Sequence, residues 1–424
     1  MAKKYTYYLY TQADNIYRRK RTLSTVVFFN YLAYGHINST LPLVAELVCR
    51  GERVIYYALE EFQATIEDTG AIFRSYGQDF PSHLTNAEFD TAMTVHGLLQ
   101  TSKWVLDNLL QEVRAINPDY IAYEAFCPWG RYVAQVLQVP TVSIVSGLLM
   151  NTRILCSIPS ATLDAVHPLV TRYKYTARSQ ALAHTLSKKY RFKKPHFAEV
   201  LSNKGMLNIV YTSKLFQPLA NSFDHRHFKF VGPPILPRPK TISFPFEALE
   251  KKPLIYISLG TIFNKREAFY RMCFEAFADK DWQIVMAIGH SVSRESLGAV
   301  PANFIVRKFV PQLEILQRTT LFITHGGMNS VSEALYYNVP LVVVPQSAAD
   351  QPWIAKRIVE LGVGKMLPYK KVTVRNLCRV VEEVLSEPTY AQAVARVGES
   401  LRAAGGCQTA VDEIQTFKCI HGIT

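Results

Sequence analysis

The chain has 424 residues, of which 49% are hydrophobic and 19% charged, a composition typical of a globular protein and unlike a disordered or fibrous one. Its length exceeds what one hydrophobic core usually organises, so we expect two domains of about 200 residues each. The net charge of +13 could serve an anionic ligand, but the basic residues lie outside any recognisable nucleic-acid module, so no nucleic-acid partner is expected.

The ends of the chain and its cysteines indicate a cytoplasmic protein. Residues 1–24 precede the first convincing strand and lack the apolar segment of a secretory signal, so we expect an N-terminal extension. An upstream start codon, a flexible arm and a basic and aromatic segment that adheres to a surface are the alternatives, of which the first two are favoured. No apolar run approaches the ~18 residues of a membrane span. The seven cysteines include no C-x-x-C pair, which favours reduced thiols over disulfides or a zinc site.

Strands and helices alternate over residues 25–231. Apolar runs predict strands at 25–30, 53–59, 118–126, 140–147, 205–213 and 228–234. Helical patterns such as residues 130–138 separate some of these runs. Such alternation predicts a parallel sheet that is covered by helices on both faces.

Residues 232–253 contain six prolines and predict a linker, because proline is excluded from helix interiors and central strands. The alternation then resumes in a second domain, residues 254–424. Its expected strands are 254–260, 283–289, 303–310, 320–327 and 340–345, with helices near 266–278 and 329–337 and further helices to the end. The expected fold is therefore α/β, with two Rossmann-like doubly wound domains facing a cleft, and the last helices are candidates to pack back on the first domain.

A histidine lies in the turn between the first strand and the first helix. In open α/β sheets, ligands bind beyond the carboxyl ends of the strands, which is where this turn places His36. Gly35 beside it allows close approach of other atoms. A lone histidine in a turn is more often structural, so this position alone does not assign a role.

The segment "THGGMNSVSEAL" (324–335) joins a strand to a helix through two glycines. A helix start offers unpaired N–H groups and a partial positive charge, so Gly327, Asn329 and Ser330 predict a site for an anion such as a diphosphate. His325 adds a further donor. Glu333 has two interpretations: a capping box with Ser330, or a partner for ribose hydroxyls.

Two shorter segments predict polar contacts at the same edge of the second sheet. "SLGT" (258–261) repeats the arrangement of strand, glycine turn and hydroxyl groups, although it is a weak signal alone. "ADQPW" (349–353) places Asp350 and Gln351 where both could bind vicinal sugar hydroxyls. The alternative is a polar turn before a helix that starts near Pro352.

Together, "FVPQLEIL", "THGGMNSVSEAL" and "VPQSAADQ" resemble the nucleotide-sugar signature of the GT-B glycosyltransferases that use UDP-sugars. "GHINSTLPLVAELVCRGERVIYY" resembles their bacterial macrolide-glycosyltransferase branch. The resemblance covers nearly the whole chain from about Thr25. It implies an inverting enzyme that moves a hexose, with glucose the expected sugar, from a UDP-sugar to a hydroxyl of a hydrophobic small molecule such as a macrolide or polyphenol. A nucleotide-sugar epimerase and a binding protein without catalysis are the alternatives.

The resemblance also implies a donor site, with the uracil near residues 309–312, the ribose at Glu333 and the transferred sugar at Asp350 and Gln351. No cofactor and no metal are expected, because the helix start and its neighbouring donors would stabilise the leaving diphosphate. The implied donor residues are Ser258, Gly260, Thr261, Phe309, Val310, Gln312, His325, Gly327, Asn329, Ser330, Glu333, Asp350 and Gln351.

In the same way, the resemblance implies that His36 is the general base that removes a proton from the acceptor hydroxyl. An imidazole with an ordinary pKa near 6.5 suits that task at neutral pH. The family usually orients the histidine with an aspartate, whereas this chain has Glu124, which is longer by one methylene. The acceptor is expected against Phe126, Trp129 and Met150.

Overall fold

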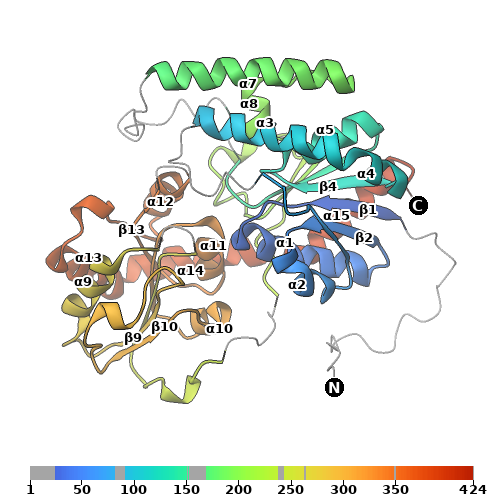
Figure 1. Ribbon diagram of the computed structural model, residues 1–424. Coiled ribbons are helices and arrows are strands. Elements are labelled where there is room, and N and C mark those ends of the chain that lie inside the picture. The colour runs from blue at the N-terminus through green and yellow to red at the C-terminus, as the bar shows by residue number, and fades with distance from the viewer. Residues whose placement is uncertain are drawn as a thin grey trace, which may run out of the picture.

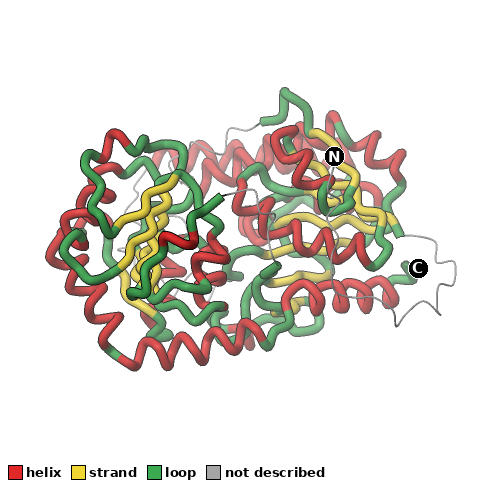
Figure 2. The backbone as a smooth tube through the Cα atoms, turned by 90° about the horizontal axis from the view of Figure 1, so that it is seen from below, coloured by secondary structure: helices red, strands yellow, loops and turns green. Residues whose placement is uncertain are grey.

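The computed structural model describes residues 24–81, 91–149, 151, 169–236, 243–261, 264–347 and 350–423 (Figure 1). Residues 1–23 of the expected N-terminal extension lie outside this range, as does Met150. The chain folds into two α/β domains whose sheets form separate groups of strands (Figure 2), which confirms the predicted fold class. Within the described ranges, no helix combines the length and apolar character that crossing a membrane requires.

The first domain contains a seven-stranded parallel sheet in the order β3-β2-β1-β4-β5-β6-β7, counted over the described residues. Its strands are β1 (Thr25–Phe29), β2 (Arg53–Ala58), β3 (Ile72–Ser75), β4 (Tyr120–Glu124), β5 (Thr141–Val145), β6 (Leu207–Val210) and β7 (Phe228–Phe230). Its helices are α1 (Tyr34–Cys49), α2 (Gln63–Glu67), α3 (Thr91–Asn108), α4 (Leu110–Ile116), α5 (Pro128–Leu137), α7 (Leu169–Tyr190) and α8 (Phe197–Ser202).

The second domain contains a six-stranded parallel sheet in the order β10-β9-β8-β11-β12-β13, again over the part of the chain described. Its strands are β8 (Leu254–Ser258), β9 (Gln283–Ala287), β10 (Phe304–Arg307), β11 (Leu321–Thr324), β12 (Leu341–Val343) and β13 (Gly364–Met366). Its helices are α9 (Glu267–Phe277), α10 (Gln312–Leu316), α11 (Met328–Tyr336), α12 (Gln351–Glu360), α13 (Val374–Ser386) and α14 (Pro388–Arg402), and α15 (Gly406–Ile420) ends the chain.

The central strands are buried at every position because both faces of each sheet are covered. In β1, Val27 and Phe29 pack into the core on one face. Val26 and Phe28 pack into the core on the opposite face. This alternation is the two-residue period of a strand, and it explains why the strand has a continuous hydrophobic sequence without a polar side.

The order of strands places a topological switch point in each sheet. In the first domain, β1 lies between β2 and β4, so the connections that leave β1 and β4 diverge at that point. In the second domain, β8 lies between β9 and β11 in the same way. A crevice at the carboxyl ends of these strands is where open α/β sheets bind ligands. The residues that follow β1, β4, β8 and β11 are therefore the candidates for a site.

The last helix, α15, packs on the first domain and not on the second. Its apolar residues Ala410, Val411, Ile414 and Phe417 belong to the same core as the buried face of α1. Figure 1 shows the C-terminus beside the strands of the first domain. The chain therefore crosses between the domains twice, once after β7 and once between α14 and α15.

Two short strands were missing from the sequence prediction. β3 alternates between exposed and half-buried residues, and β13 has only three residues. Both lie at the edge of a sheet, where one face of the pattern is solvated and the apolar signal is weak. The segment after β12 was predicted as helical to the end of the chain, and the structure corrects this, because β13 lies between α12 and α13.

Candidate active site

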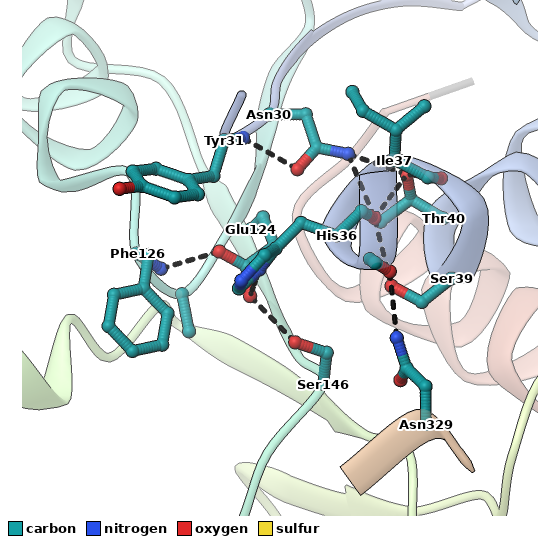
Figure 3. Close-up of polar contacts among 12 residues, drawn as sticks. Asn30, Tyr31, His36, Ile37, Ser39, Thr40, Glu124, Phe126, Ser146 and Asn329 are labelled. Atoms are coloured by element: carbon teal, nitrogen blue, oxygen red, sulfur yellow. Dashed lines mark hydrogen bonds and ion pairs between the residues drawn. The ribbon is translucent and has the colours of Figure 1, made fainter. Parts of the chain in front are cut away.

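The first part of the site is the connection from β1 to α1, and the structure corrects the predicted position of His36, which lies in the helix and not in the turn before it. α1 starts at Tyr34, so His36 lies in its first turn and its imidazole points toward the end of β4 (Figure 3). Its side chain is 25% exposed and faces the cleft. The register of β1 and β4 pairs Phe29 with Tyr123. The next residue of β4, Glu124, is thereby brought beside the turn.

Glu124 is completely buried and holds three groups at once. Its Oε1 lies 3.1 Å from Nδ1 of His36 and accepts a hydrogen bond from Ser146 Oγ at 2.8 Å. Its Oε2 accepts a hydrogen bond from the Phe126 main-chain N–H at 2.7 Å. A buried carboxylate is stable only when it is paired in this way. The contact with Nδ1 has ion-pair length but lies off the direction of an ideal hydrogen bond.

The pKa of His36 is raised above its ordinary value. Burial acts to lower the pKa, but the negative charge of Glu124 and its contact with the imidazole outweigh that effect, and Asp350 across the cleft adds to it. Because Nδ1 faces Glu124, Nε2 is the nitrogen left to take a proton from a substrate. A histidine held by a carboxylate in this way can act as a general base and stabilise the imidazolium that forms.

Aromatic side chains surround the imidazole on its cleft side. The ring of Tyr31 lies 5.1 Å from that of His36, and the ring of Phe126 lies 5.4 Å from it, both edge to face. Phe126 is 41% exposed and can meet an apolar ligand. Tyr31 is a contact that sequence reasoning missed, because nothing in its local pattern separates it from an ordinary loop residue.

The structure corrects the assignment of Trp129 to the acceptor surface. Its side chain is 0% exposed, and its Nε1–H donates to the hydroxyl of Tyr76 at 3.2 Å in the core of the first domain. The first turn of α5 packs this side into the sheet, so Trp129 cannot touch a ligand. Met150, the third predicted acceptor contact, lies outside the described residues.

The second part of the site is the turn between β11 and α11. His325 lies directly after β11, and its ring fits between two glycines. A Cβ atom on Gly260 would lie 2.6 Å from the ring, and one on Gly327 would lie 2.4 Å from it. Both glycines are therefore required for the imidazole to occupy this position.

Burial lowers the pKa of His325 to about 4, although a hydrogen bond to the Ser258 main chain partly opposes the shift. His325 is therefore neutral at physiological pH. A neutral imidazole donates or accepts a hydrogen bond without adding charge. Together with the start of α11, whose N-cap is Gly327, it forms a polar pocket that suits an anion.

Glu333 is buried in α11 and binds Gln312 of α10. Gln312 Nε2 donates to Glu333 Oε2 at 2.6 Å, and Gln312 Oε1 accepts from the Tyr256 hydroxyl at 3.0 Å. The capping-box interpretation of Ser330 and Glu333 is wrong, since the helix already begins at Met328 and no side chain caps it. Glu333 and Gln312 instead form a polar pair next to the anion pocket.

The other residues predicted to bind the sugar donor differ in how accessible their side chains are to a ligand. Ser258 ends β8 and its hydroxyl accepts from the Gly260 N–H at 3.4 Å, while Thr261 is exposed. Phe309 is half-buried, with its ring 4.4 Å from that of His290. Val310 packs in the core of the second domain, so its side chain is not available to a ligand and only its main chain can take part.

Asp350 and Gln351 begin α12 but have different surroundings. Asp350 is exposed and close enough to His36 to influence its pKa. Gln351 is buried, and its Oε1 accepts hydrogen bonds from the main-chain N–H groups of Gln346 at 2.7 Å and Ser347 at 3.0 Å. The oxygen of Gln351 therefore holds the preceding loop in place, and a contact of this side chain with the sugar stays a prediction.

A hydrogen bond between the two domains joins the two parts of the site. Asn329 Nδ2, in the first turn of α11, donates to the main-chain oxygen of Gly35 at 2.7 Å. Gly35 immediately precedes His36, so the anion pocket of one domain is joined to the histidine turn of the other (Figure 3). Away from this point, Arg357 of α12 donates to the main-chain oxygens of Phe216 and Leu215.

Comparison with known proteins identifies the family. The chain is 35% identical over 399 residues to the uncharacterized UDP-glucosyltransferase YojK of Bacillus subtilis, covering 92% of this chain and 97% of that protein. The chain belongs to the macrolide-type UDP-glycosyltransferase family. Residues 271–416 match the C-terminal domain of the erythromycin biosynthesis protein CIII-like family.

Other relatives of this glycosyltransferase include the NDP-glycosyltransferase YjiC of Bacillus subtilis, 34% identical and covering 92% of this chain and 97% of that protein. The demethyllactenocin mycarosyltransferase of Streptomyces fradiae is 31% identical and covers 93% and 86% of the two chains. Among solved structures, the calicheamicin glycosyltransferase CalG4 superposes with a TM-score of 0.80 at 28% identity, covering 94% of this chain and 99% of that one. The glycosyltransferase therefore has the GT-B fold that the resemblance implied.

Proposed function

We propose that this glycosyltransferase is an inverting hexosyltransferase that moves glucose from UDP-glucose to a hydroxyl of a hydrophobic small molecule, with a macrolide or polyphenol as the acceptor. The observation that carries the proposal is the arrangement of His36 and Glu124 on one wall of the cleft, directly opposite the anion pocket of α11 and joined to it by Asn329. Bacillus relatives named as UDP-glucosyltransferases support the donor. Streptomyces relatives that act in macrolide glycosylation support the acceptor class.

The proposed reaction is a single displacement. Nε2 of His36 removes the proton from the acceptor hydroxyl, while the oxygen of that hydroxyl attacks the anomeric carbon of the sugar. The bond between that carbon and the diphosphate oxygen breaks on the opposite face, and UDP leaves with the electron pair. Glu124 stabilises the imidazolium, and an α-linked donor gives a β-linked product.

The leaving diphosphate is bound in this proposal by the N–H groups at the start of α11, by neutral His325 and by the side chains of Asn329 and Ser330. Fixed donors that face a developing charge stabilise it without reorganisation. We therefore propose that transfer needs no metal ion. Turnover should be unchanged by EDTA. A requirement for added Mg²⁺ or Mn²⁺ after EDTA treatment would contradict the proposal that transfer needs no metal ion.

The test is incubation of the purified protein with UDP-glucose and a panel of polyphenols and macrolides, with mass spectrometry of the products. Glucosides with β anomeric protons in the NMR spectrum are expected. Replacement of UDP-glucose by other UDP- or TDP-sugars in the same assay tests the donor. Tight binding of UDP-glucose without any glycoside from the panel would instead favour a nucleotide-sugar-binding protein.

A further inference from the structure

Asn30 is a buried side chain that the catalytic scheme does not use. It directly follows β1 and is completely buried, although it lies only six residues before His36. A buried amide is costly unless its groups are hydrogen-bonded. The hydrogen bonds of Asn30 therefore show which parts of the chain its buried side chain holds together.

The side chain of Asn30 binds the first turn of α1 (Figure 3). Nδ2 contacts the main-chain oxygen of His36 at 3.2 Å and Thr40 Oγ1 at 2.7 Å. It also contacts the hydroxyl of Tyr56. Oδ1 accepts from the Tyr31 N–H at 2.6 Å. The amide thus joins the end of the strand to the turn that carries the histidine.

The main chain of Asn30 is held as well. Its carbonyl oxygen accepts a hydrogen bond from the Tyr76 hydroxyl at 3.0 Å. That hydroxyl in turn accepts from Trp129 Nε1–H at 3.2 Å. Asn30 is consequently fixed to the core of the first domain on one side and to the His36 turn on the other.

The start of α1 needs such support because its N-cap residue, Ala33, provides no side-chain hydrogen bond. Helix starts without a side-chain cap are less stable than capped ones. Outside the turn itself, the contacts that hold it include the Asn30 bonds, the bond from Asn329 to Gly35, the bond from the Tyr34 hydroxyl to Glu61 and the contact of His36 with Glu124. A displacement of the turn would move the imidazole relative to both Glu124 and the acceptor oxygen.

We propose that Asn30 is a positioning residue for the glycosyl transfer reaction, which fixes the main chain of His36 so that the imidazole stays between Glu124 and the acceptor hydroxyl. This rests on the function proposed above. Misplacement of a catalytic group by about 1 Å typically costs about 100-fold in rate. The role is separate from substrate binding, because Asn30 is buried beneath the turn and has no access to the cleft.

The test compares Asn30→Ala with Tyr56→Phe as a matched control. Tyr56→Phe removes a buried hydroxyl from the same network but leaves the bond from Asn30 to His36. We expect Asn30→Ala to lower kcat on the order of 10- to 100-fold with unchanged affinity for UDP in calorimetry. Tyr56→Phe should lower Tm but keep kcat within about twofold, because it does not loosen the histidine turn.

Two readouts separate positioning from a general loss of stability. The loss in Asn30→Ala should be smallest for acidic phenols, which need the base least. The acid limb of its kcat/KM profile should move to lower pH, since an imidazole that moves away from Glu124 loses the interaction that raises its pKa. If Asn30→Ala does not fold, Asn30→Asp keeps the volume and the acceptor for the Tyr31 N–H but lacks both N–H donors, and the same loss is expected.

Equal kcat losses in Asn30→Ala and Tyr56→Phe, or a loss that does not depend on acceptor acidity, would overturn the assignment of Asn30. Equal rates of glucose transfer by the wild type and by Asn30→Ala would also overturn the assignment of Asn30. That result would leave the proposed function intact. The absence of transfer by the wild type with every acceptor would instead contradict the proposed function itself.

Discussion

Each half of the molecule places a histidine at the carboxyl edge of its sheet, and the two environments move the histidine pKa in opposite directions. His36 follows β1 and His325 follows β11, each at a switch point and each next to the start of a helix. The pKa of His36 is raised because Glu124 faces it. The pKa of His325 is lowered to about 4 because its ring is buried between glycines.

This comparison shows how one supersecondary unit serves two chemical tasks. The fold supplies the position in each half, namely a loop at the carboxyl edge of the sheet beside a helix N-terminus. The neighbour of the imidazole then decides its proton state. A carboxylate makes a base that can hold a proton, whereas a tight glycine pocket makes a neutral hydrogen-bonding group suited to a diphosphate.

The largest expected effect is on His36. His36→Ala should lower kcat by about 10² to 10⁴-fold, because the acceptor hydroxyl loses its general base. The affinity for UDP should remain at the wild-type value in calorimetry, since the nucleotide is expected on the other domain. An unchanged turnover rate would show that His36 is not the general base. The proposed difference in role between His36 and His325 would then be wrong.

Substitution of Glu124 tests why the two histidines differ. Glu124→Gln removes the negative charge and should lower kcat on the order of 10- to 100-fold, because the imidazolium loses the opposite charge that stabilises it. The acid limb of the pH profile should move to lower pH because the pKa of His36 falls. Glu124→Asp is the matched control: it keeps the charge and should retain much of the activity. A wild-type rate in Glu124→Gln together with a loss in Glu124→Asp would show that the size of the side chain matters and its charge does not.

A substitution in the second domain alone can displace the ring of His325 from its position between two glycines. Gly327→Ala introduces a Cβ that would lie 2.4 Å from the imidazole, so the ring must move. Overpacking of this kind costs about 1–3 kcal/mol, which corresponds to a loss of about 10-fold or more in UDP affinity if the ring leaves the anion pocket. Gly147→Ala is a control for an added Cβ atom, since nothing lies within 4 Å of that position and its φ, like that of Gly327, is not positive. Equal UDP affinity in the two variants would contradict the proposed pocket.

The smallest expected effect is a difference in pH dependence between binding and catalysis. Turnover should fall as the pH decreases through the raised pKa of His36, because the protonated imidazole cannot accept a proton. The affinity for UDP-glucose should stay constant over the same range down to about pH 5, because His325 titrates only near its pKa of about 4. Calorimetry with UDP-glucose is suitable, since its diphosphate diester does not titrate there. Parallel loss of binding and turnover would contradict the separate roles.

The sequence predicted the positions that local patterns encode. Apolar runs predicted the central strands, and "THGGMNS" predicted the glycine turn that opens α11, whereas anion binding at that turn stays a prediction. The roles proposed for His36 and Glu124 needed the family resemblance, because the two residues lie far apart in the chain. Glu333 was ambiguous because a capping box and a ligand contact require the same spacing; the start of α11 at Met328 excludes the capping box, and the ligand contact stays a prediction.

Other contacts have no signal in the sequence. Ser146 binds Glu124 from the end of β5, and Asn30 binds His36 from beneath the turn, yet each is an ordinary polar residue after a strand. Gln351 has the same neighbours in the chain whether its oxygen faces a sugar or its own loop. Trp129 was misassigned because an aromatic residue next to a predicted site can equally face the core. These outcomes depend on side-chain direction, which spacing alone does not determine.

The return of α15 to the first domain has a consequence for how the protein is made. Lys418 near the end of the chain forms a buried ion pair with Glu52, which also accepts a hydrogen bond from Ser24 at 2.5 Å, and the apolar face of α15 covers part of the first sheet. During synthesis, the ribosome completes the first sheet long before α15 emerges, so the nascent domain exposes that apolar surface while the entire second domain is translated. Cutting the chain at the linker would leave the same surface bare, and the amino-terminal half would lack part of its own core.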